Sequence, residues 1–105
     1  MSTLMLNAAT ATGPGPAFEI RGTNQLYANR SFQAVGIISA STGTTSVAIE
    51  VSNDGINYIT LGTITLSLTT SASSDAFYVQ TVYEYYRANV TQITTNGTVS
   101  VYMKA

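Results

Sequence analysis

The side chains of this 105-residue sequence with the most capacity for acid–base chemistry are five carboxylates: Glu19, Glu50, Asp54, Asp75 and Glu84. The sequence contains no His and no Cys, so the usual imidazole bases, thiolate nucleophiles and transition-metal ligands are missing. Hydrolysis of a glycosidic bond needs two carboxyl groups on either side of that bond. No two are paired in the sequence, although two could meet in space. We predict a protein that is not an enzyme and has no cofactor.

The Ser-Asn-Asp-Gly sequence at 52–55 is a second candidate site, because calcium prefers carboxylate and amide oxygens gathered in a tight turn. It offers one charged ligand, and no Glu follows at the spacing of an EF-hand loop. An Asx turn, in which the aspartate accepts backbone hydrogen bonds, accounts for the same residues. We therefore predict a structural turn and no metal.

Aromatic residues gather in the segment 83–87, Tyr-Glu-Tyr-Tyr-Arg, with Phe77 and Tyr78 nearby. In a strand, alternate side chains share a face, which places Tyr86 on one face and both Tyr85 and Arg87 on the other. Three interpretations stay open for these aromatics: core packing, a protein interface and a platform for a glycan.

Arg87 is the most informative charge because it lies among these aromatic residues. It is expected to stack on a tyrosine or to pair with Glu84 or Glu50, although an ordinary solvent-facing position is equally open. We predict that the exposed side of segment 83–87, with Tyr83, Tyr85 and Arg87, contributes to an interface.

Charged residues make up 9% of the chain and hydrophobic residues 45%, where about 25% charged is typical. A surface with so little charge is easily buried against another protein, which favours assembly over the alternative of a neutral monomeric extracellular module. The net charge is −1 and the four basic residues are scattered, so nucleic acid is not expected as a partner. No apolar run could span a membrane and no signal peptide begins the chain, which predicts synthesis in the cytoplasm without export.

The apolar residues from position 17 onward follow a period of two, which is the period of a strand. Inward positions are expected at 47, 49 and 51, at 64, 66 and 68, at 99, 101 and 103, and at Val35 and Ile37. The fold class is therefore all-β: an antiparallel, jelly-roll-like β-sandwich of seven to eight strands, with a small barrel as the alternative. The expected strands cover 18–21, 31–39, 45–51, 58–68, 76–82, 85–92 and 98–104.

Turn residues predict which strands pair directly. Asn96-Gly97 within 95–98 is typical of a two-residue hairpin, so the last two strands are expected to pair. Segment 41–44 is a second expected hairpin and 52–55 a third, while 69–75 is expected to be a longer polar loop.

Residues 1–16 are rich in small side chains and include two prolines, which are unsuited to a central strand. We predict a flexible N-terminal arm over 1–16 and a single β-sandwich domain over 17–105, although a short strand at 3–7 is also open. The arm is either disordered or lies across a neighbouring subunit. In the second case its interface residues would be Leu4, Leu6, Pro14 and Pro16.

Segment 47–58 resembles the strand-turn-strand element "ixvxxSnDGxnW/Y" of discoidin-like jelly-roll domains and of small tailed-phage and prophage proteins. In those phage proteins a Thr- and Leu-rich strand follows, as at 61–67 here. A segment of the form "yvRanvt…Gtvsvym" comes next, which 86–91 and 97–103 match. The aromatic residue after the turn is Tyr58, where Trp is common elsewhere.

The resemblance implies a phage virion protein located in the particle, most naturally a decoration or cement protein on the capsid. Its partners would be other copies of itself, preferably in a trimer, and the major capsid protein. A head-to-tail or tail accessory protein and a carbohydrate-binding host-attachment module are the alternatives. No glycan site is transferred to a named residue, because discoidin-like lectins have longer domains.

Overall fold

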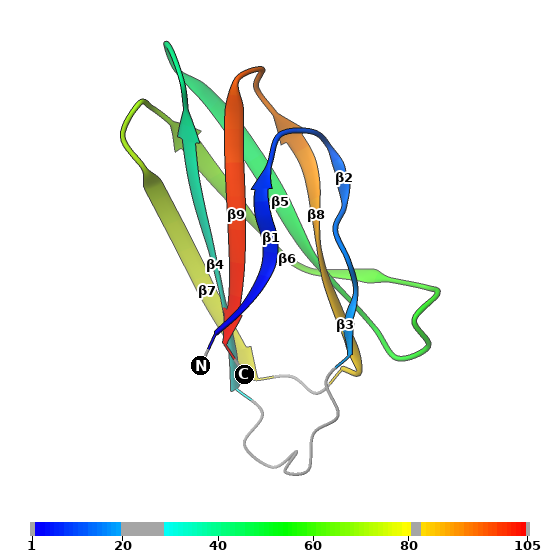
Figure 1. Ribbon diagram of the computed structural model, residues 1–105. Coiled ribbons are helices and arrows are strands. Elements are labelled where there is room, and N and C mark those ends of the chain that lie inside the picture. Colours follow the sequence, from blue (N-terminus) through cyan, green and yellow to red (C-terminus); the bar gives the residue numbers. More distant parts are fainter. Residues whose placement is uncertain (1, 20–28, 81–82, 105) are drawn as a thin grey trace.

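A computed structural model of the protein describes residues 2–19, 29–80 and 83–104, and within these residues it contains strands and no helix (Figure 1). The predicted strands are all present where described, with ends that shift by a few residues; Val82, Arg21 and the other residues between the three ranges lie outside the description. The strands are β1 (Ser2–Ala9), β2 (Gly13–Pro14), β3 (Phe18–Glu19), β4 (Asn29–Ile38), β5 (Gly43–Ser52), β6 (Ile59–Leu68), β7 (Ser73–Gln80), β8 (Tyr85–Ile93) and β9 (Gly97–Lys104).

The strands form two sheets that lie face to face (Figure 1). One sheet has the order β1-β9-β4-β7, and the other has the order β2-β8-β5-β6 with β3 also paired to β8. Every pairing is antiparallel. The predicted antiparallel β-sandwich is therefore confirmed.

The core lies between the sheets and takes alternate residues from most strands, as a period of two requires. The predicted inward positions of β5, β6 and β9 are confirmed, because all of them are buried. On the other face of β5 Thr44 is exposed and Ser46 and Glu50 are partly exposed, while Ala48 and Ser52 are buried as well. Ala48 is a small residue between longer cross-strand neighbours, and the hydroxyl of Ser52 is turned into the following loop.

The predicted inward face of β4 is wrong. Val35 and Ile37 lie on the outer face, whereas Phe32 and Ile38 are buried on the inner face. A shift of one residue exchanges the two faces of a strand, and Phe32 decides between them because its ring stacks at 5.4 Å from the ring of Phe77 and 6.0 Å from that of Tyr86.

Two of the three predicted hairpins are wrong. Segment 52–55 joins β5 to β6, which pair directly as expected. Segments 41–44 and 95–98 instead carry the chain from one sheet to the other, since β4 and β9 lie in the first sheet and β5 and β8 in the second. Asn96 does take a positive φ of 74°. A tight turn reverses the direction of the chain, but it does not decide whether the two strands that it joins pair with each other. Both edges of β8 are already occupied, by β5 and by β2 with β3.

The prediction of a flexible arm over 1–16 is corrected by the structure. Ser2–Ala9 forms β1 at the edge of the four-stranded sheet, paired with β9. Met5 is buried in the core with 1% of its surface exposed, and Gly13–Pro14 pairs with β8. The 69–75 loop is also shorter than expected, because β7 begins at Ser73.

Candidate functional site

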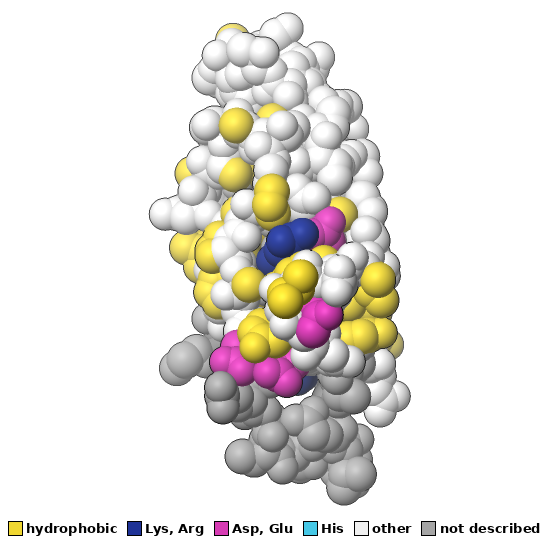
Figure 2. Space-filling view, turned by 90° about the vertical axis from the view of Figure 1, so that its right-hand side faces the viewer, with side chains coloured by type: hydrophobic (Ala, Val, Ile, Leu, Met, Phe, Trp, Pro, Cys, Tyr) yellow, Lys and Arg dark blue, Asp and Glu magenta, His cyan; other side chains and the backbone are white. Residues whose placement is uncertain are grey.

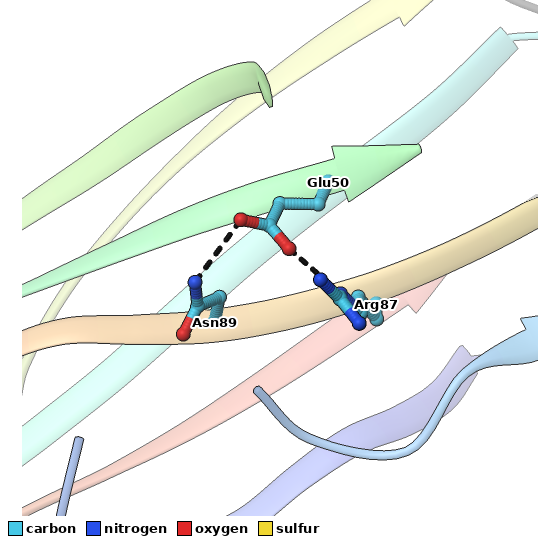
Figure 3. A network of polar contacts seen from close by, with 3 residues as sticks. All are labelled: Glu50, Arg87 and Asn89. Carbon is cyan, nitrogen blue, oxygen red and sulfur yellow. Dashed lines mark hydrogen bonds and ion pairs between the residues drawn. The ribbon is translucent and has the colours of Figure 1, made fainter. Parts of the chain in front are cut away.

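A cluster of polar side chains lies on the outer face of the five-stranded sheet, where β5 and β8 run side by side (Figure 3). Glu50 and Arg87 are direct cross-strand partners. Arg87 Nε donates a hydrogen bond of 2.7 Å to Glu50 Oε1, and Asn89 Nδ2 donates one of 3.0 Å to Glu50 Oε2. Both carboxylate oxygens of Glu50 are therefore engaged within the sheet.

Tyr58 completes this cluster from the end of the loop that follows β5. The guanidinium carbon of Arg87 lies 3.8 Å from the centre of the Tyr58 ring, which is the geometry of a cation–π contact. The Arg87 side chain is 28% exposed and that of Glu50 is 14% exposed. Both expected partnerships of Arg87, stacking on a tyrosine and pairing with Glu50, are thus present together.

The loop between β5 and β6 is organised by Asp54. Its Oδ1 accepts hydrogen bonds from the backbone N–H groups of Asn57 and Ile56, each at 2.8 Å, and from Ser52 Oγ at 2.7 Å. Its Oδ2 accepts one from Asn57 Nδ2 at 2.9 Å. These bonds, the backbone bonds of Asn57 and Ile56 first, hold the pKa of the Asp54 carboxyl well below its usual range. The predicted Asx turn is confirmed, and the carboxylate serves the loop itself.

The same loop rests against the start of β8. Asn53 Oδ1 accepts a hydrogen bond of 3.1 Å from the backbone N–H of Glu84. Gly55 has a φ of +74°, and a Cβ at this position would lie 3.3 Å from the ring of Tyr85. Glycine is favoured at this position because a side chain is rarely compatible with a positive φ and because the Tyr85 ring leaves little room for one. The carboxylate of Glu19, and less strongly that of Glu84, raises the pKa of the Tyr85 phenol.

The aromatic segment 83–87 divides between core and surface, as its alternation predicted. Tyr86 is fully buried, and its hydroxyl accepts a hydrogen bond of 3.1 Å from the backbone N–H of Tyr83. Tyr83 packs partly against the core. Tyr85 and Arg87 are half-buried on the outer face, so of the three predicted interface residues these two lie on that face.

The predicted interface residues of the N-terminal segment are separated: Leu4 and Leu6 lie in the four-stranded sheet, Pro14 lies in the five-stranded sheet, and Pro16 lies outside the strands. Leu4 lies on β1 and is 42% exposed, while Leu6 packs partly against the core. Pro14 and Pro16 are exposed, and Pro14 is the cross-strand neighbour of Asn89 on β8. The structure therefore brings Pro14 next to the Arg87 cluster but separates Leu4 from it.

Three members of the cluster were not predicted as interface residues: Glu50, Tyr58 and Asn89. Glu50 had been named as a possible partner of Arg87, and its cross-strand position follows only from the order of β5 and β8. The aromatic residue after the Ser-Asn-Asp-Gly turn was the available signal for Tyr58.

Figure 2 shows the side of the molecule on which β2 and β3 lie, where basic and acidic side chains adjoin near the middle and apolar side chains surround them. Among the described residues no group of three or more acidic side chains is placed to hold a metal ion. The described residues also include no helix of the length and apolar character needed to cross a membrane. The described groups on this face include the hydrogen bonds of Arg87 and Asn89 to Glu50 and the stacking contact of Arg87 with Tyr58.

No protein-family model matches this chain, and no curated protein matches it by sequence. Solved structures do match it. The SPBc2 prophage-derived protein YomS has a TM-score of 0.57 at 12% identity, covering 98% of this chain and 90% of YomS. The PBSX exported protein XepA has a TM-score of 0.53 at 16% identity over 98% of this chain.

A CBM4 structure has a TM-score of 0.52 at 11% identity over 97% of this chain. The chain spans only 36% of XepA and 64% of the CBM4 structure. At these identities the three matches show a shared β-sandwich fold.

Proposed function

We propose that this protein is a non-catalytic structural component of a tailed-phage particle, and that it decorates and stabilises the capsid through protein–protein contacts. The observation that carries the proposal is the fold shared with prophage-derived YomS over nearly the full length of both chains. The resemblance of segments 47–58, 86–91 and 97–103 to small phage proteins agrees with it.

The chemistry of the outer face supports a contact surface rather than a reaction centre. Both oxygens of Glu50 and both oxygens of Asp54 already accept hydrogen bonds from neighbouring groups. The bonds to Asp54 also lower the pKa of its carboxyl, which makes that carboxylate a poor proton acceptor. With 9% charged residues, contacts to other particle proteins would be mainly uncharged and therefore little affected by salt.

Immunogold labelling of purified particles of the parent phage tests this function. Antibody bound over the head supports capsid decoration, and the expected partner is then the major capsid protein. Label confined to the neck or tail would move the protein to an accessory position there. Unlabelled particles, with the protein detected elsewhere in the lysate, would contradict a virion role.

A carbohydrate-binding role in host attachment is the second candidate, and the match to the CBM4 structure favours it. Tyr78 on β7 is 77% exposed and Tyr102 on β9 is 38% exposed. They lie on either side of β4 on the outer face of the four-stranded sheet, where stacking on a sugar ring is sterically open. A glycan array probed with the wild type and with Tyr78→Ser tests it, and binding lost in the variant alone would support this role.

A further inference from the structure

Strand β6 (Ile59–Leu68) is the last strand of its sheet, and among the described strands it pairs with β5 alone. An outermost strand presents unpaired backbone N–H and C=O groups along its free edge. Proteins that stay monomeric protect such edges with charged residues, prolines, bulges or short strands.

The sequence of β6, Ile-Thr-Leu-Gly-Thr-Ile-Thr-Leu-Ser-Leu, contains no charged residue and no proline. Its pairing with β5 has one irregularity, between the partners of Ile49 and Glu50, and runs in regular register from Gly62 to Leu68. Thr63, Thr65 and Ser67 are exposed on its outer face. Near the end of the strand, Ser73 Oγ donates a hydrogen bond of 2.8 Å to the Ser67 carbonyl oxygen. The unprotected part of the edge is therefore the segment 62–66.

Exposed apolar side chains accompany this edge at its N-terminal end. Ile56, in the preceding loop, is 80% exposed, and Ile59 is 58% exposed. Among the residues that the structure describes, they are the two most exposed large aliphatic side chains. Apolar surface next to a free strand edge is a feature of surfaces that bind another chain.

We propose that β6 pairs antiparallel with β6 of a second copy of this chain, across a two-fold axis, so that two five-stranded sheets become continuous. A two-fold axis places identical strands opposite each other, which is unfavourable when the strand carries charge. β6 carries none, so it is complementary to itself. The other sheet ends in β7, which carries the charged Asp75, and in β1, whose pairing with β9 has two irregularities.

This pairing deepens the assembly role proposed above, on which it rests, and it predicts a dimer rather than the trimer expected from the sequence. Pairing of one edge with itself closes after two copies. A trimer would need β6 to pair with a different edge of its neighbour.

Sedimentation velocity on the full chain, from micromolar to hundreds of micromolar, tests the proposal. The wild type is expected to be a dimer. In the double variant Thr63→Lys/Thr65→Lys, four ammonium groups meet across the axis, and the dimer dissociation constant should rise by more than about tenfold. The matched control is Ser74→Lys on the exposed side of β7, which should leave the dimer intact. Thermal melts of both variants report whether the fold is kept.

Hydrogen exchange of the wild-type amides gives a second readout that does not depend on any variant. In an edge strand alternate amides point away from the neighbouring strand. In a β6-paired dimer all amides of 62–66 should exchange slowly, and dilution to the monomer should release every second one.

A monomer at all concentrations, a trimer, or rapid exchange of alternate β6 amides at high concentration would overturn the pairing. The pairing would also be overturned if Ser74→Lys dissociated the dimer while Thr63→Lys/Thr65→Lys left it intact. A chain that is monomeric in solution but abundant in particles would leave the virion role standing and remove only this edge contact.

Discussion

Arg87 lies over the ring of Tyr58, with its guanidinium carbon 3.8 Å from the ring centre, although β5 separates β8 from β6 in the sheet. The contact ties the β5–β6 loop to the outer face of β8. The same guanidinium pairs with Glu50 on the intervening strand. The Arg87 side chain thus connects β8, β5 and the loop between β5 and β6.

Replacing Arg87 by Ala should lower the free energy of unfolding by about 1–3 kcal/mol, because a cation–π contact and a charge-assisted hydrogen bond are both lost. Urea denaturation monitored by circular dichroism measures this change. Lys104→Ala, which removes an exposed cation from the end of β9, is the control and should stay within about 0.5 kcal/mol. Equal effects of the two substitutions would mean that the Arg87 contacts contribute nothing to stability.

Asp54 predicts a dependence of stability on pH. Its pKa is lowered in the folded state, so its stabilising contribution is fully present above the unfolded value of 3.8 and is lost as the pH falls below it. Asp54→Asn has no charge to lose, and it places an amide N–H₂ against the side-chain donor of Asn57. The variant should be less stable than the wild type at neutral pH. The difference in stability between the two proteins should become smaller as the pH falls below 3.8. Thermal melts from neutral pH into acid measure this difference. A difference in melting temperature between the two proteins that does not change with pH would refute this account.

Truncation of Met5 should destabilise the protein much more than truncation of Leu4, which distinguishes an integral strand from a flexible arm. Met5 is 1% exposed and Leu4 is 42% exposed. Met5→Ala should cost about 2–5 kcal/mol, the range for a buried large side chain. Leu4→Ala should cost far less, although both changes lie in the same strand. Chemical denaturation compares them, and a negligible cost for Met5→Ala would restore the interpretation of this segment as an arm.

Gly36 faces the core at a point where β4 approaches β6 closely. A Cβ built there would lie 2.6 Å from Leu68 Cδ2 and 3.1 Å from Leu66 Cδ1. Gly36→Ala should therefore destabilise the protein by about 1–3 kcal/mol through overpacking. Gln33→Ala on the exposed face of the same strand is the control. A Gly36→Ala protein as stable as the control would show that the sheets separate to make room.

The strands were predictable from the sequence because period-two alternation and turn residues are local signals. The face of β4 was not, since both of its faces carry apolar residues and only contacts of Phe32 with rings on other strands decide between them. Arg30 shows the same limit: it lies on the inner face of β4 with 6% exposure, 5.4 Å from the Tyr86 ring centre.

Strand order was equally beyond local signals, and the candidate site depends on it. Asn96 predicted a tight turn correctly, but whether the chain then pairs or crosses is decided by which edges of β8 are already occupied. Arg87 was identified from the sequence because it lies among aromatic residues. Tyr58 reaches Arg87, and Asn89 reaches Glu50, only because β5 lies between β6 and β8.

The most direct test of the central proposal is the copy number of this protein in purified particles of its parent phage, measured by quantitative mass spectrometry relative to the major capsid protein. A capsid decoration protein is predicted to be present in numbers comparable to those of the capsid lattice. A handful of copies per particle would contradict decoration and place the protein at the neck or tail. Its absence from particles would contradict the virion role and leave glycan binding as the function to pursue.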